Sequence, residues 1–268
     1  MANTLPPLPR HIYVERSVQL SPHLQRIYFS SDDFSDFPAD LGAHIKLFFP
    51  EQPELKPVLP KRNALGKVVW PEGKKPITRT YTIRDFLADE QLLVIDFVRH
   101  ADFGIASNWA THAQIGQVLG LAGPGGQARF QADADYFVFV VDLSALAMLA
   151  ASLDCLPEHA LGEAWVKIDD PTDAIVIHTP KGIKLNWLVK PDHFEHYIDQ
   201  QFEQLNWEKH NISVSLAGEN ASVVALRKLL KTKYLIQKND LYAVPYWKKG
   251  QTEEAYHQER HQVMDDES

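Results

Sequence analysis

The first half of the chain alternates apolar and polar residues in short runs separated by turn residues. Such runs predict β-strands, because successive side chains of a strand point to opposite faces. Turn signals such as the Ser-Pro-His of residues 21–23 favour antiparallel pairing and a barrel. The expected strands span residues 11–20, 24–30, 42–49, 79–86, 92–100 and 118–123, with a tight turn at 123–126.

The second half changes to continuous apolar runs that alternate with helical patterns. This alternation is typical of a buried parallel sheet with helices on its faces. Strands are expected at residues 136–142, 162–169, 174–179, 212–218 and 241–247, and helices at 144–156, about 191–205 and 220–232. The change of pattern predicts an antiparallel barrel domain over residues 1–132, followed by a parallel α/β domain with a C-terminal helix over residues 133–268.

Composition narrows the function classes. Of 268 residues, 45% are hydrophobic and 23% are charged, as in soluble globular proteins, and the net charge of −8 argues against general nucleic-acid binding. The single cysteine, Cys155, excludes an internal disulfide and a cysteine-ligated iron–sulfur cluster, and its apolar surroundings predict a buried thiol. Since neither a signal peptide nor an apolar run of ~20 residues is found, we expect a cytoplasmic protein without membrane insertion.

The segment Arg-Thr-Tyr-Thr carries the first candidate chemistry. In a strand, Arg79 and Tyr81 share one face, and Thr80 and Thr82 share the other. A guanidinium beside an aromatic ring suits a ligand that is anionic at one end and flat at the other. An ordinary solvent-facing barrel strand explains the same pattern.

Small residues precede a helical stretch after the strand at 92–100. Gly104, Ala106 and Ser107 would let the backbone approach a ligand closely, and Ser107 is a plausible helix N-cap. Simple capping explains this turn equally well.

Taken together, several segments resemble the siderophore-interacting proteins, a family of FAD-dependent ferric-siderophore reductases in the ferredoxin-reductase-like superfamily. The resemblance runs from residue 42 to residue 250, most of the chain. It rests on R-x-Y-T at 79–82, D-F-V-x-H at 96–100, G-x-A-S-x-W-A at 104–110, G-P-x-G at 123–126, A-G-E before a helix at 217–219, and Y-W-K-K-G at 246–250.

The resemblance implies a set of FAD-binding residues. Arg79 would contact the pyrophosphate, Tyr81 would pack on the flavin, and Thr82 would approach the reactive edge of the ring. The other implied positions follow the ribityl chain, the pyrophosphate turn and the adenine end: Thr80, Asp96, Phe97, Val98, His100, Gly104, Ala106, Ser107 and Trp109.

The family also implies a cationic pocket for the anionic ferric chelate. The matching basic positions are Lys46, Lys248, Lys249 and Arg129, although each single residue also suits a solvated surface. The iron arrives with the siderophore, so neither a catalytic acid–base residue nor a protein metal site is expected. Two histidine pairs, His193/His196 and His257/His261, have helical spacing but lack a clear third ligand.

The electron donor is left open between NAD(P)H and a ferredoxin. Many members carry G-D-E-T-A after the first α/β strand, whereas this chain has Val141, Asp142, Leu143 and Ser144 there. Either this connection drifts without consequence, or NAD(P)H binding is weakened, since valine blocks close backbone approach.

We therefore expect a monomeric enzyme that uses FAD to reduce ferric siderophores and release Fe(II) during iron acquisition. Two alternatives remain. One is an NAD(P)H-dependent flavoprotein reductase with another acceptor, and the other is a non-catalytic module that binds ferric siderophores.

Overall fold

The computed structural model describes residues 8–35, 37–52, 54–71, 75–100, 104–253 and 255–256. The chain forms two compact units that divide between Gln127 and Ala128. The predicted boundary after residue 132 falls just past this division. Within the described part of the chain, no helix is both long and apolar enough to cross a membrane.

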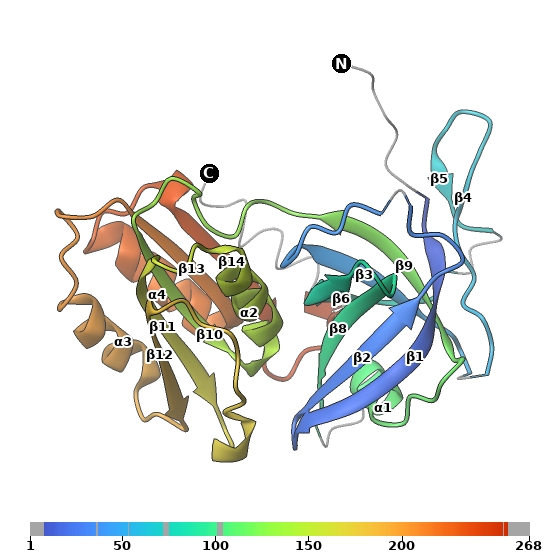
Figure 1. The fold of residues 1–268 in the computed structure, drawn as a ribbon, viewed down its shortest axis with the longest axis horizontal. Helices are drawn as coiled ribbons and strands as arrows, with labels where there is room; N and C mark the ends of the chain where they lie inside the picture. The colour runs from blue at the N-terminus through green and yellow to red at the C-terminus, as the bar shows by residue number, and fades with distance from the viewer. Residues whose placement is uncertain are drawn as a thin grey trace. The chain divides into compact units, whose positions relative to one another are not determined.

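The first unit is an antiparallel sheet of seven strands in the order β6-β3-β9-β1-β2-β8-β7. Figure 1 labels these strands except β7. The prediction of an N-terminal antiparallel barrel is confirmed. The strands are β1 (Arg10–Ser21), β2 (Leu24–Ser30), β3 (His44–Phe49), β6 (Ile77–Thr82), β7 (Asp85–Leu87), β8 (Leu92–Val98) and β9 (Val118–Gly125). A separate hairpin joins β4 (Lys61–Arg62) to β5 (Val68–Val69), and helix α1 covers Ile105–Thr111.

The strand expected over residues 79–86 is two strands, and the break between them closes the barrel. The Ile83 N–H donates to the Ala43 carbonyl beside β3, whereas the Arg84 N–H donates to the Val94 carbonyl of β8, each over 2.9 Å. The chain thus changes its pairing partner at residues 83–84. Because β6 and β7 are the two ends of the strand order, this change joins the sheet into a closed surface.

Large apolar side chains fill the inside of this unit. The Phe97 ring centroid lies 6.4 Å from that of Phe29 and 6.0 Å from that of Trp109. Burial of each such side chain stabilises the fold by about 1.5–3 kcal/mol. The core includes Ile12, Val14, Ile27, Phe29, Ile45, Leu47, Phe49, Ile83, Leu93, Ile95, Phe97, Trp109, Leu119 and Leu121.

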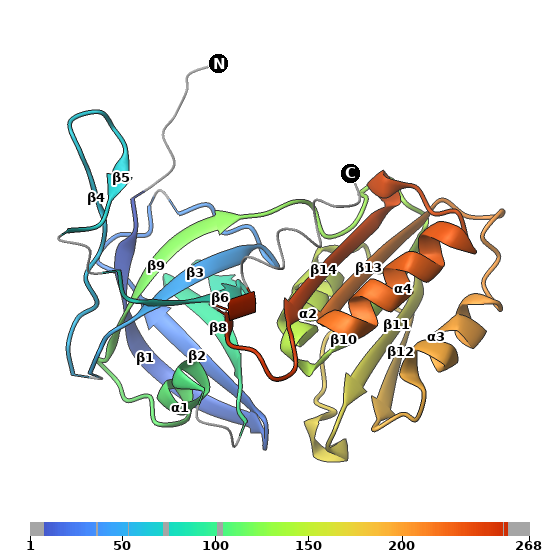
Figure 2. The same cartoon turned by 180° about the vertical axis from the view of Figure 1, so that it is seen from behind.

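The second unit is a parallel sheet in the order β12-β11-β10-β13-β14, which confirms the predicted α/β fold. Helix α2 covers one face, and α3 and α4 cover the other (Figures 1 and 2). The strands are β10 (Tyr136–Asp142), β11 (Leu161–Ile168), β12 (Gly182–Val189), β13 (Ile212–Glu219) and β14 (Leu241–Trp247). The helices are α2 (Leu146–Cys155), α3 (Phe194–Phe202) and α4 (Asn220–Thr232).

Three local predictions are wrong. Residues 174–179 form no strand, and Val176 there is 99% exposed, whereas the unpredicted β12 pairs with β11. Cys155 is exposed because it lies at the end of α2, beyond the buried part of that helix. Gly123 and Gly125 continue strand β9, so only Gly126 remains outside it where a tight turn was expected.

Candidate functional site

Strand β6 presents Arg79 and Tyr81 on one face, as the strand periodicity predicts. Both side chains are half-buried, and the Tyr81 ring centroid lies 4.4 Å from that of Phe97 in the barrel core. Arg79 Nη1 donates to the Thr78 carbonyl over 2.9 Å. This strand therefore places a guanidinium and a core-supported aromatic ring two residues apart.

On the other face of β6, Thr80 contacts the first predicted substrate residue, Lys46, which lies on the neighbouring strand β3. Thr80 is the direct partner of Lys46 across the β3–β6 pair, and Lys46 Nζ donates to Thr80 Oγ1 over 2.5 Å. Thr82, two positions along the same face, is buried. The structure thus places a predicted siderophore-binding lysine on β3, directly beside the predicted flavin-binding strand β6.

Two side chains of β8, those of Asp96 and Phe97, contact other residues of the protein. Asp96 receives a bidentate pair from Arg26, with Nε–Oδ1 at 2.7 Å and Nη2–Oδ2 at 2.8 Å. Burial acts to lower the pKa of Arg26, but the hydrogen-bonded Asp96 carboxylate outweighs it and raises that pKa. Phe97 is fully buried in the core. Any contact of Asp96 or Phe97 with a cofactor would therefore use the backbone, whereas Val98 is half-buried and His100 is exposed.

The prediction that Ser107 is an N-cap is wrong, because α1 begins at Ile105 with Gly104 as its N-cap. Ser107 Oγ instead accepts from the His100 N–H over 2.9 Å and donates to the His100 carbonyl over 3.3 Å. A Cβ at Gly104 would lie 2.4 Å from His100 Cε1, so the imidazole packs directly on the glycine. Ala106 is buried. The β8–α1 connection is thus held by the Ser107 hydroxyl, and the imidazole of His100 lies against Gly104.

Trp109 lies in the barrel core and is 7% exposed. Its ring centroid is 5.7 Å from that of Phe49. The indole Nε1 is buried and has no hydrogen-bond partner among the described residues. An unpaired buried donor costs about 1–3 kcal/mol, so an acceptor at this point would stabilise the site.

His44 belongs beside these residues but was not predicted. A Cβ at Gly126, whose φ is +113°, would lie 2.8 Å from His44 Nδ1. The imidazole therefore lies over the end of the Gly-Pro-Gly-Gly segment, and glycine is required there. The signal was available in the sequence, since His44 is two positions before Lys46 on the same strand face.

In the second unit, the predicted lysines follow strand β14. Lys248 is half-buried and Lys249 is exposed, and Trp247 before them is 43% exposed, so it is not part of the core. Trp247 Nε1 donates to Asp142 Oδ2 over 2.8 Å. Arg129 is half-buried, and its carbonyl accepts from Ser215 Oγ over 2.5 Å.

The segment that corresponds to the family's dinucleotide motif spans the end of strand β10 and the start of a 3-10 helix. Val141 is buried within β10, and Leu143 begins the 3-10 helix Leu143–Ala145 directly after Asp142. Burial raises the pKa of Asp142, whereas its hydrogen bonds with Ser144, Trp247 and the Glu219 N–H act in the opposite direction. Asp142 was not among the predicted site residues.

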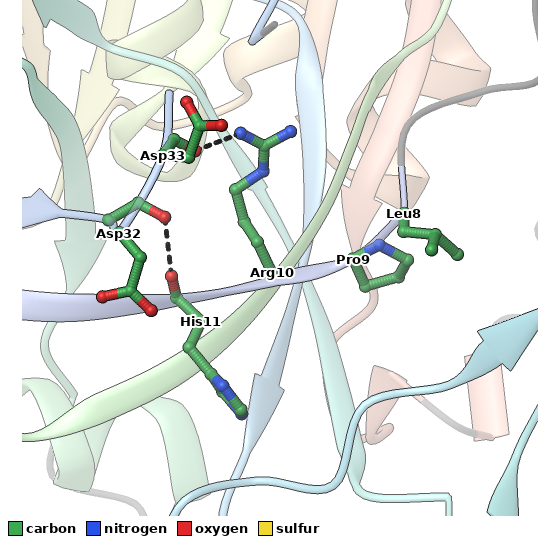
Figure 3. Close-up of a pocket in the computed structure, with 7 residues that line it drawn as sticks. Leu8, Pro9, Arg10, His11, Asp32 and Asp33 are labelled. Carbon is green, nitrogen blue, oxygen red and sulfur yellow. Dashed lines mark hydrogen bonds between the residues drawn. The ribbon is translucent and has the colours of Figure 1, made fainter. Parts of the chain in front are cut away.

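The hollow in Figure 3 contains none of the predicted site residues. It encloses about 280 Å³ at the start of β1. Arg10 there donates to the Asp33 carbonyl over 2.5 Å, and the carboxylates of Asp32 and Asp33 disfavour an anionic ligand. Its lining residues are Leu8, Pro9, Arg10, His11, Ser31, Asp32 and Asp33.

Among the described residues, no three His, Cys, Asp or Glu side chains gather as metal ligands. His193 caps α3 and His196 lies on it, in contact with Gln200. The pair His257 and His261 lies outside the described residues.

Comparison with known families now identifies the chain. Residues 13–128 match the siderophore-interacting FAD-binding domain, and residues 134–250 match the siderophore-interacting protein domain. The chain belongs to the siderophore-interacting protein family, as the sequence motifs predicted.

Individual relatives align along nearly the whole chain. Ferric vibriobactin reductase ViuB of Vibrio cholerae is 40% identical over 97% of this chain and 96% of its own length. The NADPH-dependent ferric-chelate reductase of Escherichia coli is 32% identical over 89% of this chain and 92% of its own.

Solved structures agree with this assignment. The crystal structure of the siderophore-interacting protein SipS from Aeromonas hydrophila matches with a TM-score of 0.82 at 33% identity, over 96% of this chain and 98% of that one. A ferredoxin reductase of carbazole 1,9a-dioxygenase shares the fold at a TM-score of 0.67 and 14% identity, over 90% of this chain and 67% of that one. The predicted ferredoxin-reductase-like fold is confirmed.

Proposed function

We propose that the protein is a cytoplasmic, FAD-dependent ferric-siderophore reductase that releases Fe(II) for iron acquisition. One observation carries this proposal: both halves match the family, and the chain is 40% identical to a ferric vibriobactin reductase along 97% of its length. In this proposal the unit that ends at Gln127 is the FAD-binding domain, and the unit that begins at Ala128 is the NAD(P)H-binding-like domain.

The residues of the barrel fit FAD. The half-buried Arg79 guanidinium suits a pyrophosphate, the Tyr81 ring suits a flat heterocycle, and the unpaired Trp109 Nε1 offers a buried donor. FAD held by these residues would supply the electron transfer, with two electrons accepted from a donor and one given to each of two Fe(III) ions. The remaining FAD-binding positions are Thr80, Thr82, Asp96, Phe97, Val98, His100, Gly104, Ala106 and Ser107.

The protein binds its substrate by charge. Siderophore chelates of Fe(III) are often anionic, and a chain of net charge −8 must build a cationic surface locally. We assign chelate contacts to Lys46 in the first unit and to Arg129, Lys248 and Lys249 in the second. Siderophore oxygen atoms are hard ligands that hold Fe(II) less tightly than Fe(III), so reduction releases the metal.

The electron donor is either NAD(P)H or a ferredoxin. Val141 and Leu143 favour the ferredoxin. The name of the E. coli relative specifies NADPH. Val141 lies within strand β10, so its backbone is extended, and its side chain is buried. In many family members a glycine stands at this position, where it lets the backbone approach a dinucleotide closely. The protein acts as a monomer.

The test compares electron acceptors. FAD-loaded protein is photoreduced without oxygen and mixed in a stopped-flow instrument with a ferric tris-catecholate, a quinone or free flavin mononucleotide. We expect the ferric chelate to reoxidise the flavin fastest. Faster reoxidation by quinone or free flavin would favour another reductase, and saturable binding of the chelate without reoxidation would favour a binding module.

A further inference from the structure

The Asp142 carboxylate is fully used by the protein. Its Oδ1 accepts from the Ser144 N–H over 2.9 Å and from Ser144 Oγ over 2.5 Å. Its Oδ2 accepts from the Glu219 N–H and from Trp247 Nε1, each over 2.8 Å. Because a carboxylate offers about four lone-pair positions, none is left for a bound molecule.

The sheet topology explains why these groups meet. Asp142, Glu219 and Trp247 are the last residues of β10, β13 and β14, which lie side by side in the parallel sheet (Figure 2). Their carboxyl ends therefore share one edge. Gly218 has φ of +143°, and a Cβ there would lie 2.5 Å from Asp142 Oδ2, so glycine gives the carboxylate its space.

A second carboxylate holds the same segment. Glu219 Oε2 caps α4 by accepting from the Ala221 and Ser222 N–H groups, over 2.6 Å and 3.3 Å. Glu219 Oε1 accepts from the Lys249 N–H over 3.3 Å. Asp142 thus holds the Trp247 side chain and Glu219 holds the Lys249 backbone, with Lys248 between these two points.

The Trp247 bond has a directional role. The indole is 43% exposed, so packing alone does not fix it, and its hydrogen bond to Asp142 sets its orientation. Lys248 and Lys249 directly follow Trp247 in the chain, so the orientation of Trp247 fixes where these two lysines begin.

We infer that Asp142 and Trp247 are positioning residues for siderophore binding, acting through Lys248 and Lys249. The inference rests on the proposed function, because it takes these lysines as the contacts for an anionic chelate. Asp142 serves this purpose and not the binding of a nicotinamide dinucleotide, since its acceptor positions are occupied.

The test measures binding without redox chemistry. Gallium(III) replaces iron in the tris-catecholate, because Ga(III) forms a similar anionic chelate and is not reduced. Calorimetry gives its Kd for the FAD-loaded wild type and for Trp247→Phe, which keeps an aromatic ring but loses the N–H donor. We expect a three- to tenfold weaker Kd, roughly the loss of one hydrogen bond, with unchanged FAD content. Trp187→Phe on β12, at the opposite edge of the sheet, is the matched control and should bind as the wild type does.

A double-mutant cycle separates positioning from a direct contact. In the Lys248→Ala/Lys249→Ala background, Trp247→Phe should have no further effect on Kd. Asp142→Asn, which cannot satisfy all four donors, should reproduce the effect of Trp247→Phe in the wild-type background. An unchanged Kd in both variants, or a full additional effect without the lysines, would overturn the inference.

The two proposals fail in different ways. If the wild type binds the gallium chelate but does not reduce the ferric one, the reductase proposal fails and the positioning test still stands. If the wild type does not bind the gallium chelate, the inference is overturned directly.

Discussion

Lys46 and Thr80 face each other across the β3–β6 pair, and Lys46 Nζ donates to Thr80 Oγ1 over 2.5 Å. Thr80 lies between Arg79 and Tyr81, the residues that we assign to the FAD pyrophosphate and to the flavin ring. A proposed substrate residue and proposed cofactor residues therefore share one strand pair. This pairing places a cation near the position expected for the flavin.

Lys46→Ala should weaken recognition of an anionic substrate. We expect KM for an anionic ferric tris-catecholate to rise about five- to twentyfold and its dependence on ionic strength to flatten, because a charge–charge attraction is lost. KM for a neutral ferric tris-hydroxamate should change little. Lys209→Ala removes an exposed lysine elsewhere and serves as the control. Equal effects on the two chelates would mean that Lys46 does not act by charge.

Lys248→Ala/Lys249→Ala tests the lysines of the second unit. The double variant should raise KM for the anionic chelate and lower its salt sensitivity, while FAD content stays the same. Steady-state reduction at several salt concentrations gives both values. Unchanged kinetics would place the substrate pocket elsewhere.

Arg79→Ala should lower the affinity for FAD. The lost charge-assisted contact with pyrophosphate contributes about 1.5–3 kcal/mol, which corresponds to roughly ten- to 150-fold in Kd. Flavin released on desalting at micromolar protein measures the effect. Arg16→Ala, which removes an arginine that lies over the Tyr28 ring, is the control. Full retention of flavin by Arg79→Ala would contradict the assignment.

NADH and NADPH at micromolar concentration should reduce the bound flavin poorly. Val141 blocks close backbone approach and Leu143 removes a polar group, and together these changes would weaken dinucleotide binding by tens- to about a thousandfold. Anaerobic titration should therefore show slow flavin reduction by NADH and NADPH, and faster reduction by reduced ferredoxin. Rapid reduction by micromolar NADPH would refute this.

Asp142 should make unfolding depend on pH in a defined direction. Burial raises its pKa, although the Ser144, Trp247 and Glu219 donors oppose this. The folded state then keeps a proton that the unfolded chain loses near pH ~3.9. The contribution of Asp142 to the free energy of unfolding is therefore largest below that pH. It falls as the pH rises through the pKa of Asp142 in the folded state.

Urea unfolding of the wild type and Asp142→Asn over a range of pH checks this direction. The stability of the wild type relative to the variant should decrease as pH rises and then level off. An advantage of the wild type that grows with pH would show that the hydrogen-bond donors outweigh burial.

Much of this fold is predictable because the patterns are local. Residues 136–142 and 241–247 are strands and 220–232 a helix, as predicted, because continuous apolar runs and helical periodicity mark them clearly. The edge strand β12 was missed because its mixed pattern is weaker than the exposed apolar run at 174–179.

The site is predictable only in part. The alternation of Arg79 and Tyr81 follows from strand geometry, and the motifs located the lysines. The bond between Asp142 and Trp247 joins strand ends that meet only in the folded sheet, so spacing along the chain did not predict it. The commitment of Asp96 to Arg26 likewise depends on the pairing of β2 with β8.

The central claim is that electrons leave the bound FAD for siderophore iron and release it as Fe(II). The most direct measurement mixes photoreduced, FAD-loaded protein with a ferric tris-catecholate without oxygen, in the presence of a chromogenic Fe(II) chelator. The flavin absorption should return to its oxidised form as about two Fe(II) are trapped for each FAD, because each ferric ion takes one electron. Flavin that stays reduced while the chelate binds and no Fe(II) appears would contradict the account.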